Sequence, residues 1–96
     1  MRLELRPQAE AEFRAAALWY ENEVPGLGAT FIHAVTAALN VIAERPTAFP
    51  PIGRNARRFI MRRFPYVIIY RHSGDAIVVY ACIHSHRDPK HWRKRL

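Results

Sequence analysis

The proline-rich segment of residues 46–53 divides the chain into two halves with different hydrophobic patterns. It holds three prolines and a glycine, so it cannot continue a helix and predicts a rigid, irregular connection. Before it, apolar residues recur at helical spacing; after it, they occur in short runs that are typical of strands. The 96 residues are therefore expected to form one α+β domain spanning residues 1–96.

The first half predicts a strand followed by two helices. Residues 2–6 alternate leucine with charged side chains, which indicates a short half-buried strand, and Pro7 suits the first position of a helix. Strong helix formers run from Gln8 to Glu23, Pro25-Gly26 interrupts them, and a second helical pattern continues to Pro46. Because the linker is so short, the two helices should form a hairpin. The core-facing positions are expected to be Phe13, Ala16, Ala17 and Tyr20 in the first helix and Leu27, Phe31, Val35, Leu39 and Ile42 in the second.

The second half predicts three strands, Arg57–Arg63, Tyr66–His72 and Ala76–His84, with Ser73-Gly74-Asp75 as a hairpin turn. The last of these strands is apolar on both faces, so it should be central. The expected order is β-α-α-β-β-β, with the helical hairpin packed on one face of a small antiparallel sheet. A basic tail, Lys90–Leu96, should add a helical turn or two.

The positive charge is concentrated in the second half of the chain. Residues 1–53 hold four arginines against six glutamates, whereas residues 54–96 hold eleven lysines and arginines against two aspartates, a net charge of +9. Such an excess favours a polyanionic partner, either nucleic acid or an acidic protein segment, although basic character for solubility alone is the simpler interpretation. The candidate contact residues are Arg54, Arg57, Arg58, Arg62, Arg63, Arg71, Arg87, Trp92 and Arg93.

The remaining composition argues against a secreted, membrane or metal-binding protein. Cys82 is the only cysteine and lies in an apolar run, so it is expected in the core and can form no internal disulfide. There is no apolar signal core at the N-terminus, and no stretch approaches the roughly 20 apolar residues of a membrane span. A cytoplasmic location follows. His84, His86 and His91 lack the spacing of a helical metal-binding pair, so neither a metal nor another cofactor is expected.

Two motifs resemble the RelE/ParE superfamily of bacterial toxins. One is the Phe-Pro-Tyr strand of residues 64–70, preceded by Arg63, and the other is the close His84-x-x-Arg87-x-x-x-x-Trp92. The resemblance also includes Trp19-Tyr20 and the proline that ends the second helix. It covers nearly the whole chain and is strongest to the ParE branch of plasmid stabilisation toxins. It implies the RelE/ParE-like fold and a hetero-oligomer in which an acidic, ParD-like antitoxin neutralises the toxin.

The resemblance leaves two activities to be distinguished. ParE-like toxins inhibit DNA gyrase and replication by binding, whereas RelE-like toxins cut mRNA on the ribosome with lysines and arginines on the sheet and a C-terminal tyrosine. Here Val67 and Trp92 depart from the RelE-like pattern, so gyrase inhibition without enzymatic chemistry is favoured.

Two alternatives stay open. One is a metal-independent endoribonuclease that uses His84, His86 and Arg87, since histidine titrates near neutrality; the other is an inactive toxin retained as a binding partner. The simpler interpretation of the two histidines is packing and hydrogen bonding at the end of a strand. Trp19 and Trp92 could stack on bases, but packing at the edge of a small core is the preferred interpretation.

Overall fold

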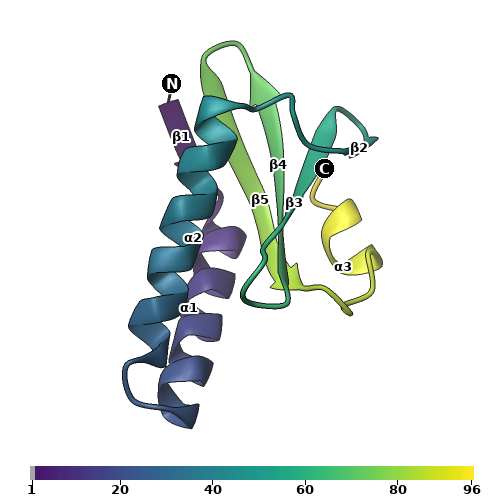
Figure 1. The fold of residues 1–96 in the computed structure, drawn as a ribbon. Helices are drawn as coiled ribbons and strands as arrows, with labels where there is room; N and C mark the ends of the chain where they lie inside the picture. Colours follow the sequence, from purple (N-terminus) through teal and green to yellow (C-terminus); the bar gives the residue numbers. More distant parts are fainter. Residues whose placement is uncertain (1) are drawn as a thin grey trace.

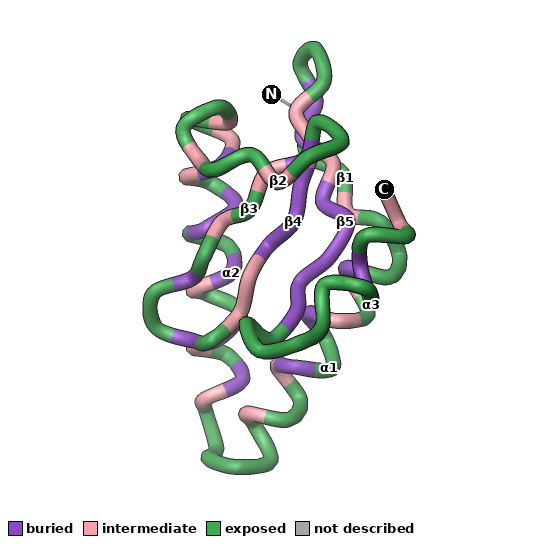
Figure 2. The backbone as a smooth tube through the Cα atoms, turned by 90° about the vertical axis from the view of Figure 1, so that its right-hand side faces the viewer, coloured by how far each residue is buried: buried purple, intermediate pink, exposed green. Residues whose placement is uncertain are grey.

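The computed structural model describes residues 2–96 and consists of three layers (Figure 1). A helical hairpin covers one face of a five-stranded sheet, and a short helix near the C-terminus lies on the opposite face (Figure 2). This arrangement confirms the α+β class. The elements are β1 (Arg2–Leu5), α1 (Pro7–Glu23), α2 (Leu27–Glu44), β2 (Pro51–Gly53), β3 (Ala56–Ile60), β4 (Tyr66–Ser73), β5 (Ala76–His84) and α3 (Lys90–Arg93).

The sheet is mixed rather than wholly antiparallel. Its strand order is β1-β5-β4-β3-β2. β3, β4 and β5 pair antiparallel as expected, and Gly74, with φ 59°, lies in the predicted hairpin turn. β1, however, pairs parallel with β5, placing Arg2 opposite Ala76 and Leu5 opposite Val79. Alternating side chains predict a strand but not the direction of its partner, which explains the difference.

The proline-rich connection between the two halves contains a short strand, β2, which the sequence did not predict. β2 pairs with β3 at the edge of the sheet, where Pro51 needs no amide hydrogen for a further neighbour. The following strand begins at Ala56 and ends at Ile60, so Arg62 and Arg63 lie in the connection to β4 instead of within a strand. The predicted irregular connection is therefore confined to residues 45–50.

The helical hairpin depends on one close backbone approach and one capping side chain. A Cβ atom on Gly28 would lie 2.7 Å from the carbonyl oxygen of Ala17, so only glycine allows α1 and α2 to approach this closely. The Glu21 carboxylate of α1 accepts hydrogen bonds from the amides of Gly26 (2.9 Å) and Gly28 (3.0 Å). It thereby satisfies otherwise unpaired donors at the start of α2.

The larger core lies between the hairpin and the sheet. Tyr20, Phe31, Phe64 and Tyr66 form an aromatic cluster there, with ring centroids 4.9–6.2 Å apart. The predicted core-facing helical residues are buried or half-buried, and Cys82 is 1% exposed, so both expectations are confirmed. α2 is long and apolar enough to cross a membrane by length and composition alone, but here its apolar face packs into this core.

A smaller core lies on the opposite face of the sheet, beneath the C-terminal residues. Its members come from β3, β4, β5, α3 and their neighbours. Together they leave little of this central sheet surface exposed. The buried residues are Ala56, Ile69, Ala81, Ile83 and Trp92, with Ile52, Val67 and Leu96 packed around them.

Candidate functional site

The first candidate surface is a groove between α2 and β3, which we call the α2–β3 groove. It has a volume of about 680 Å³. Its floor is apolar: Phe49 and Phe59 pack edge to face with centroids 4.9 Å apart, and Ile60 is 56% exposed. Its rim is cationic, because four arginines surround this floor. The lining residues are Ala34, Ala37, Ala38, Val41, Arg45, Phe49, Pro50, Arg58, Phe59, Ile60, Met61, Arg62 and Arg63.

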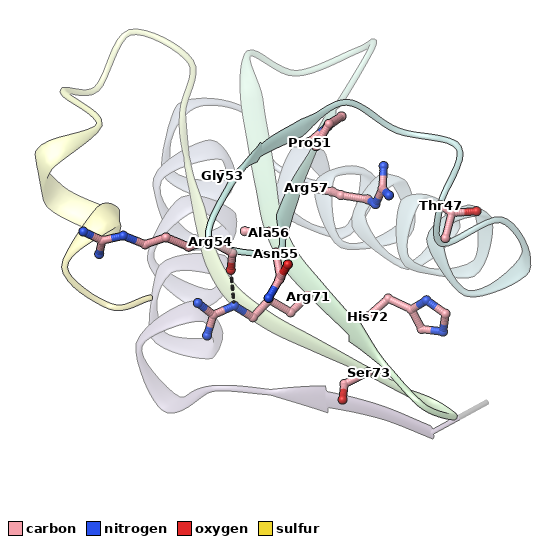
Figure 3. Close-up of a pocket in the computed structure, with 10 residues that line it drawn as sticks. All are labelled: Thr47, Pro51, Gly53, Arg54, Asn55, Ala56, Arg57, Arg71, His72 and Ser73. Atoms are coloured by element: carbon pink, nitrogen blue, oxygen red, sulfur yellow. Dashed lines mark hydrogen bonds between the residues drawn. The ribbon is translucent and has the colours of Figure 1, made fainter.

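The second candidate surface is a pocket beside the turn between β2 and β3, which we call the turn pocket (Figure 3). Its volume is about 780 Å³. Polar and basic residues line it, and it contains no large apolar side chain. The ten residues are Thr47, Pro51, Gly53, Arg54, Asn55, Ala56, Arg57, Arg71, His72 and Ser73.

Hydrogen bonds to main-chain oxygens fix the arginines of the turn pocket. Arg71 donates from Nε to the Arg54 carbonyl (2.9 Å, Figure 3) and from Nη2 to the Leu96 main-chain oxygen (2.9 Å). Arg57 donates from Nη1 to the Phe49 carbonyl at 2.7 Å. These bonds orient the guanidinium groups of Arg57 and Arg71.

The turn itself has an unusual backbone. Arg54 and Asn55 have φ values of 53° and 61°, and they form a two-residue hairpin loop between the paired residues Gly53 and Ala56. Two successive left-handed residues define a type I′ turn, which favours asparagine and glycine. Arginine at the first position is energetically less favourable than either.

The three catalytic candidates lie together at the end of β5. The rings of His84 and His86 are 5.3 Å apart between centroids, and the His86 amide donates to Nδ1 of His84 at 3.2 Å. The ring of Tyr66 packs edge to face on that of His84, with the centroids 5.6 Å apart, and the Arg87 amide donates to the His84 carbonyl. Both histidines and Arg87 are exposed. This cluster is separate from both the turn pocket and the groove, since none of its members lines either.

The remaining predicted contact residues are divided between core and surface. Trp92 is 7% exposed and belongs to the smaller core, so packing is its role in this structure. Arg93 is exposed, and its carbonyl accepts a hydrogen bond from Arg54 at 3.3 Å. Trp19 is 57% exposed on α1 and packs edge to face on Tyr20.

The structure adds a second cationic cluster that the sequence did not single out. Arg6 and Arg71 each lie 5.2 Å from the centroid of the Tyr80 ring. Burial alone would raise the pKa of Tyr80, but the neighbouring guanidinium groups of Arg6 and Arg71, the second of which donates to the Tyr80 hydroxyl at 3.5 Å, together outweigh it and lower that pKa. Arg6 belongs to the first half and Tyr80 to an apolar strand, so composition gave no reason to pair them.

A partly buried ion pair fastens the C-terminal residues to α1. Arg95 donates to both carboxylate oxygens of Glu12 at 2.9 Å, and it also donates to the Tyr80 carbonyl. The first oxygen of Glu12 additionally accepts the Cys82 amide at 3.0 Å. The hydrogen bond to Glu12 raises the pKa of Arg95, so the arginine stays charged.

Most of the positive charge in the second half has no carboxylate partner. Within residues 2–96, carboxylates lie within 4.0 Å of only three arginines, namely Arg2, Arg14 and Arg95. The arginines of both candidate surfaces therefore have no aspartate or glutamate partner within this distance in the described residues. Over the same described residues, no group of three histidine, cysteine, aspartate or glutamate side chains is placed to hold a metal ion.

The comparisons with known proteins agree with this fold. The chain is 29% identical over 92 residues to Toxin ParE2 of two strains of Mycobacterium tuberculosis, which covers 92% of this chain and 85% of that protein. Its fold matches a solved structure of the chromosomal ParDE TA system from P. aeruginosa with a TM-score of 0.74, at 17% identity, over 88% of this chain and 95% of the other. Residues 3–89 match the family model of the ParE toxin of type II toxin-antitoxin system, parDE. The chain belongs to this ParE toxin family, within the RelE/ParE superfamily.

Proposed function

We propose that this chain is a cytoplasmic toxin that inhibits DNA gyrase and is neutralised by an acidic, ParD-like antitoxin. The family and the names of its relatives support the toxin and the antitoxin partner. The gyrase target comes from the resemblance to the ParE branch. In this proposal the toxin acts by binding, and it makes or breaks no covalent bond.

The closed face of the sheet is the observation that favours binding over RNA cleavage. RelE-like cleavage would need lysines and arginines on the sheet together with a C-terminal tyrosine. In residues 2–96 the corresponding surface carries Val67, Ile69 and Ala81, and Trp92 packs against it. The centre of this face is filled with apolar side chains and offers neither a general acid nor a base for cleaving a phosphodiester.

The α2–β3 groove is the surface on which we place the antitoxin. Its apolar floor and arginine rim suit an amphipathic segment that buries apolar side chains and presents carboxylates at the edge. Burial at the floor would provide affinity, and the rim would increase the association rate.

Gyrase supercoiling with purified toxin, with and without the antitoxin encoded beside it, tests the proposed target. Inhibition that the antitoxin reverses supports the proposal. Unaltered supercoiling at excess toxin, with protein that still binds its antitoxin, would rule out gyrase as the target.

A matched pair of substitutions tests the groove. Ile60→Asp places a charge on the groove floor, whereas Leu18→Asp does the same at an equally exposed apolar position on α1, outside the groove. Antitoxin affinity, measured by calorimetry, should fall at least roughly tenfold for the first and change little for the second. Equal effects of the two variants would place the antitoxin elsewhere.

A metal-independent endoribonuclease is the second candidate, supported by the proximity of His84, His86 and Tyr66. The double variant His84→Ala/His86→Ala separates the two activities. A ribonuclease should lose toxicity while keeping its antitoxin affinity, whereas a gyrase-binding toxin should keep both. Harmless overexpression of the native chain would instead indicate an inactive toxin retained as a binding partner.

A further inference from the structure

We propose that the outer face of α1 binds the same face of a second copy of the chain, with the two helices antiparallel. The inference goes beyond the proposed function, because it concerns the toxin alone and does not depend on its target. No residue of α1 lines the α2–β3 groove, so self-association and antitoxin binding can be measured separately.

The two apolar faces of α1 are the first argument. A helix on the surface of a domain normally carries polar residues on the face turned away from the core. Ala9, Phe13 and Ala16 face the larger core, as such a helix requires. On the outer side, however, Leu18 is 62% and Trp19 57% exposed, the two highest values among the large apolar residues of the described chain. Adjacent large apolar side chains in water indicate an interaction surface.

The spacing of the outer residues is the second argument. Ala11, Ala15, Leu18 and Asn22 are all exposed and follow one another at intervals of four, three and four residues. These are the intervals of the contact positions in a two-helix coiled coil. They place the four side chains in one row, about 17 Å long, which we call the α1 seam. Trp19 flanks this row.

The match of the α1 seam to its own reverse is the third argument. In an antiparallel pair, Leu18 of each copy lies against Ala15 of the other, and Asn22 lies against Ala11. Each layer then combines a larger side chain with a small one, which fills space evenly. A parallel pair would instead place Leu18 against Leu18 and Ala15 against Ala15, so bulky and empty layers would alternate. The seam therefore favours the antiparallel arrangement.

The charges beside the α1 seam are the fourth argument. Arg14 and Glu21 lie seven residues apart on one side of it, and antiparallel packing brings each Arg14 towards Glu21 of the other copy. Arg14 is also paired with Glu10 at 2.7 Å, so it brings no unpaired positive charge to the interface. α1 holds four glutamates and one arginine. This excess of carboxylates disfavours an acidic antitoxin segment or a nucleic acid as the occupant.

The length of the α1 seam predicts a weak dimer. Two helices in contact over about 17 Å bury less than the roughly 1,200 Å² at the lower limit of stable specific interfaces. We therefore expect a dissociation constant in the micromolar range or weaker, and a monomer at low concentration.

Sedimentation velocity of the purified full chain, without antitoxin, tests the proposal over a range of micromolar concentrations. High salt removes bound nucleic acid, which could otherwise join two copies. The sedimentation coefficient of the native chain should rise with concentration. Leu18→Asp should weaken dimerisation at least roughly tenfold, and Ala15→Glu should act likewise at the centre of the seam.

Ile60→Asp is the matched control, because it introduces the same charge at an exposed apolar position in the α2–β3 groove. It should dimerise like the native chain. All three substituted positions are exposed, so circular dichroism spectra and unfolding temperatures should stay close to those of the native chain.

Disulfide formation tests the orientation of the two helices. Cys82 is the only native cysteine and is buried, so a cysteine introduced in the α1 seam is the accessible one. An equal mixture of Ala15→Cys and Leu18→Cys chains should form the mixed disulfide well above its statistical proportion. Preference for the two like pairs would overturn the antiparallel arrangement.

A native chain that stays monomeric, or association that Leu18→Asp leaves unchanged, would overturn the proposal. A monomeric native chain whose antitoxin affinity falls with Leu18→Asp would assign this face to the antitoxin instead. Unaltered gyrase supercoiling by a chain that dimerises contradicts only the gyrase proposal, and gyrase inhibition by a strictly monomeric chain contradicts only the dimer.

Discussion

The two faces of the sheet are covered in different ways. On one face, α1 and α2 bury a core of aromatic and aliphatic side chains. On the other, the few residues around α3 bury a smaller core, and they are fastened by Arg95 to Glu12 and by Leu96 to Arg71. The first cover depends on apolar burial and the second on directed polar contacts as well. We call the face covered by α1 and α2 the helical face and the face covered by α3 and the C-terminal residues the tail face. We expect the helical face to determine global stability and the tail face to respond to single polar substitutions.

Phe31→Ala should have the largest effect. Phe31 is fully buried and packs against Tyr20, Phe64 and Tyr66, so its removal leaves a cavity at the centre of the helical face. The free energy of unfolding should fall by about 3–5 kcal/mol, measured by urea denaturation. Ile32→Ala, at a neighbouring position that is 40% exposed, is the control and should cost much less. Similar losses for both would show that the helical face is not tightly packed.

Glu12→Gln should be next in size and should act mainly on the tail face. It leaves the Arg95 charge without its partner, and both side chains are only 15–20% exposed. A loss of about 2 kcal/mol is expected, below the range for fully buried pairs because some solvent reaches this one. Tryptophan fluorescence should report greater exposure of Trp92. Glu10→Gln, which breaks the exposed pair with Arg14, should change little; an equal effect would contradict a fastening role for Glu12.

Tyr70→Phe should have a smaller effect on the helical face. The Tyr70 hydroxyl donates to the Pro46 carbonyl at 2.7 Å and ties the proline-rich connection to β4. Loss of this bond should cost about 1 kcal/mol in urea denaturation. An unchanged unfolding free energy would mean that water replaces the hydroxyl at no cost.

The titration of the tyrosines should also differ between the two faces. This is the smallest of the expected effects. Burial raises the pKa of Tyr20, Tyr66 and Tyr70 on the helical face. Their contribution to stability is complete below the ordinary tyrosine pKa of about 10 and is lost as pH rises through the raised values.

Tyr80 on the tail face has a pKa shift of the opposite sign, because the neighbouring guanidinium groups of Arg6 and Arg71 together outweigh burial and lower its pKa. Its contribution is present above the ordinary tyrosine pKa and is lost as pH falls through the lowered value. In an alkaline titration followed by tyrosinate absorbance, Tyr80→Phe should remove the earliest step. Loss of a late step instead would contradict the assignment.

Local patterns predicted much of this structure, and distant pairings account for what they missed. The helical hairpin and the β4–β5 turn follow from periodicity and from Gly74, because neighbouring residues determine them. The parallel partner of β1 lies beyond both helices, so alternation in residues 2–6 could not identify it.

The candidate surfaces were predicted as a set of arginines but not as two separate sites. Arg57 and Arg58 are adjacent in sequence, yet one lines the turn pocket and the other the α2–β3 groove. The pocket is lined by β3 residues up to Arg57 and the groove by those from Arg58 onward, so the arginines alone gave no sign of where one surface ends and the other begins. The pairing of Glu12 with Arg95 joins the two ends of the chain, so no motif could indicate it.

The pairing of β1 with β5 also limits when the protein can fold during its synthesis. β1 leaves the ribosome long before its partner, which begins at Ala76, and Glu12 is made long before Arg95. Contacts so distant in sequence cannot form until almost all of the chain has emerged. A chain that has been made only as far as β4 therefore lacks the partner of β1 and the cover of its tail face, and both are completed only after β5 and Arg95 have followed.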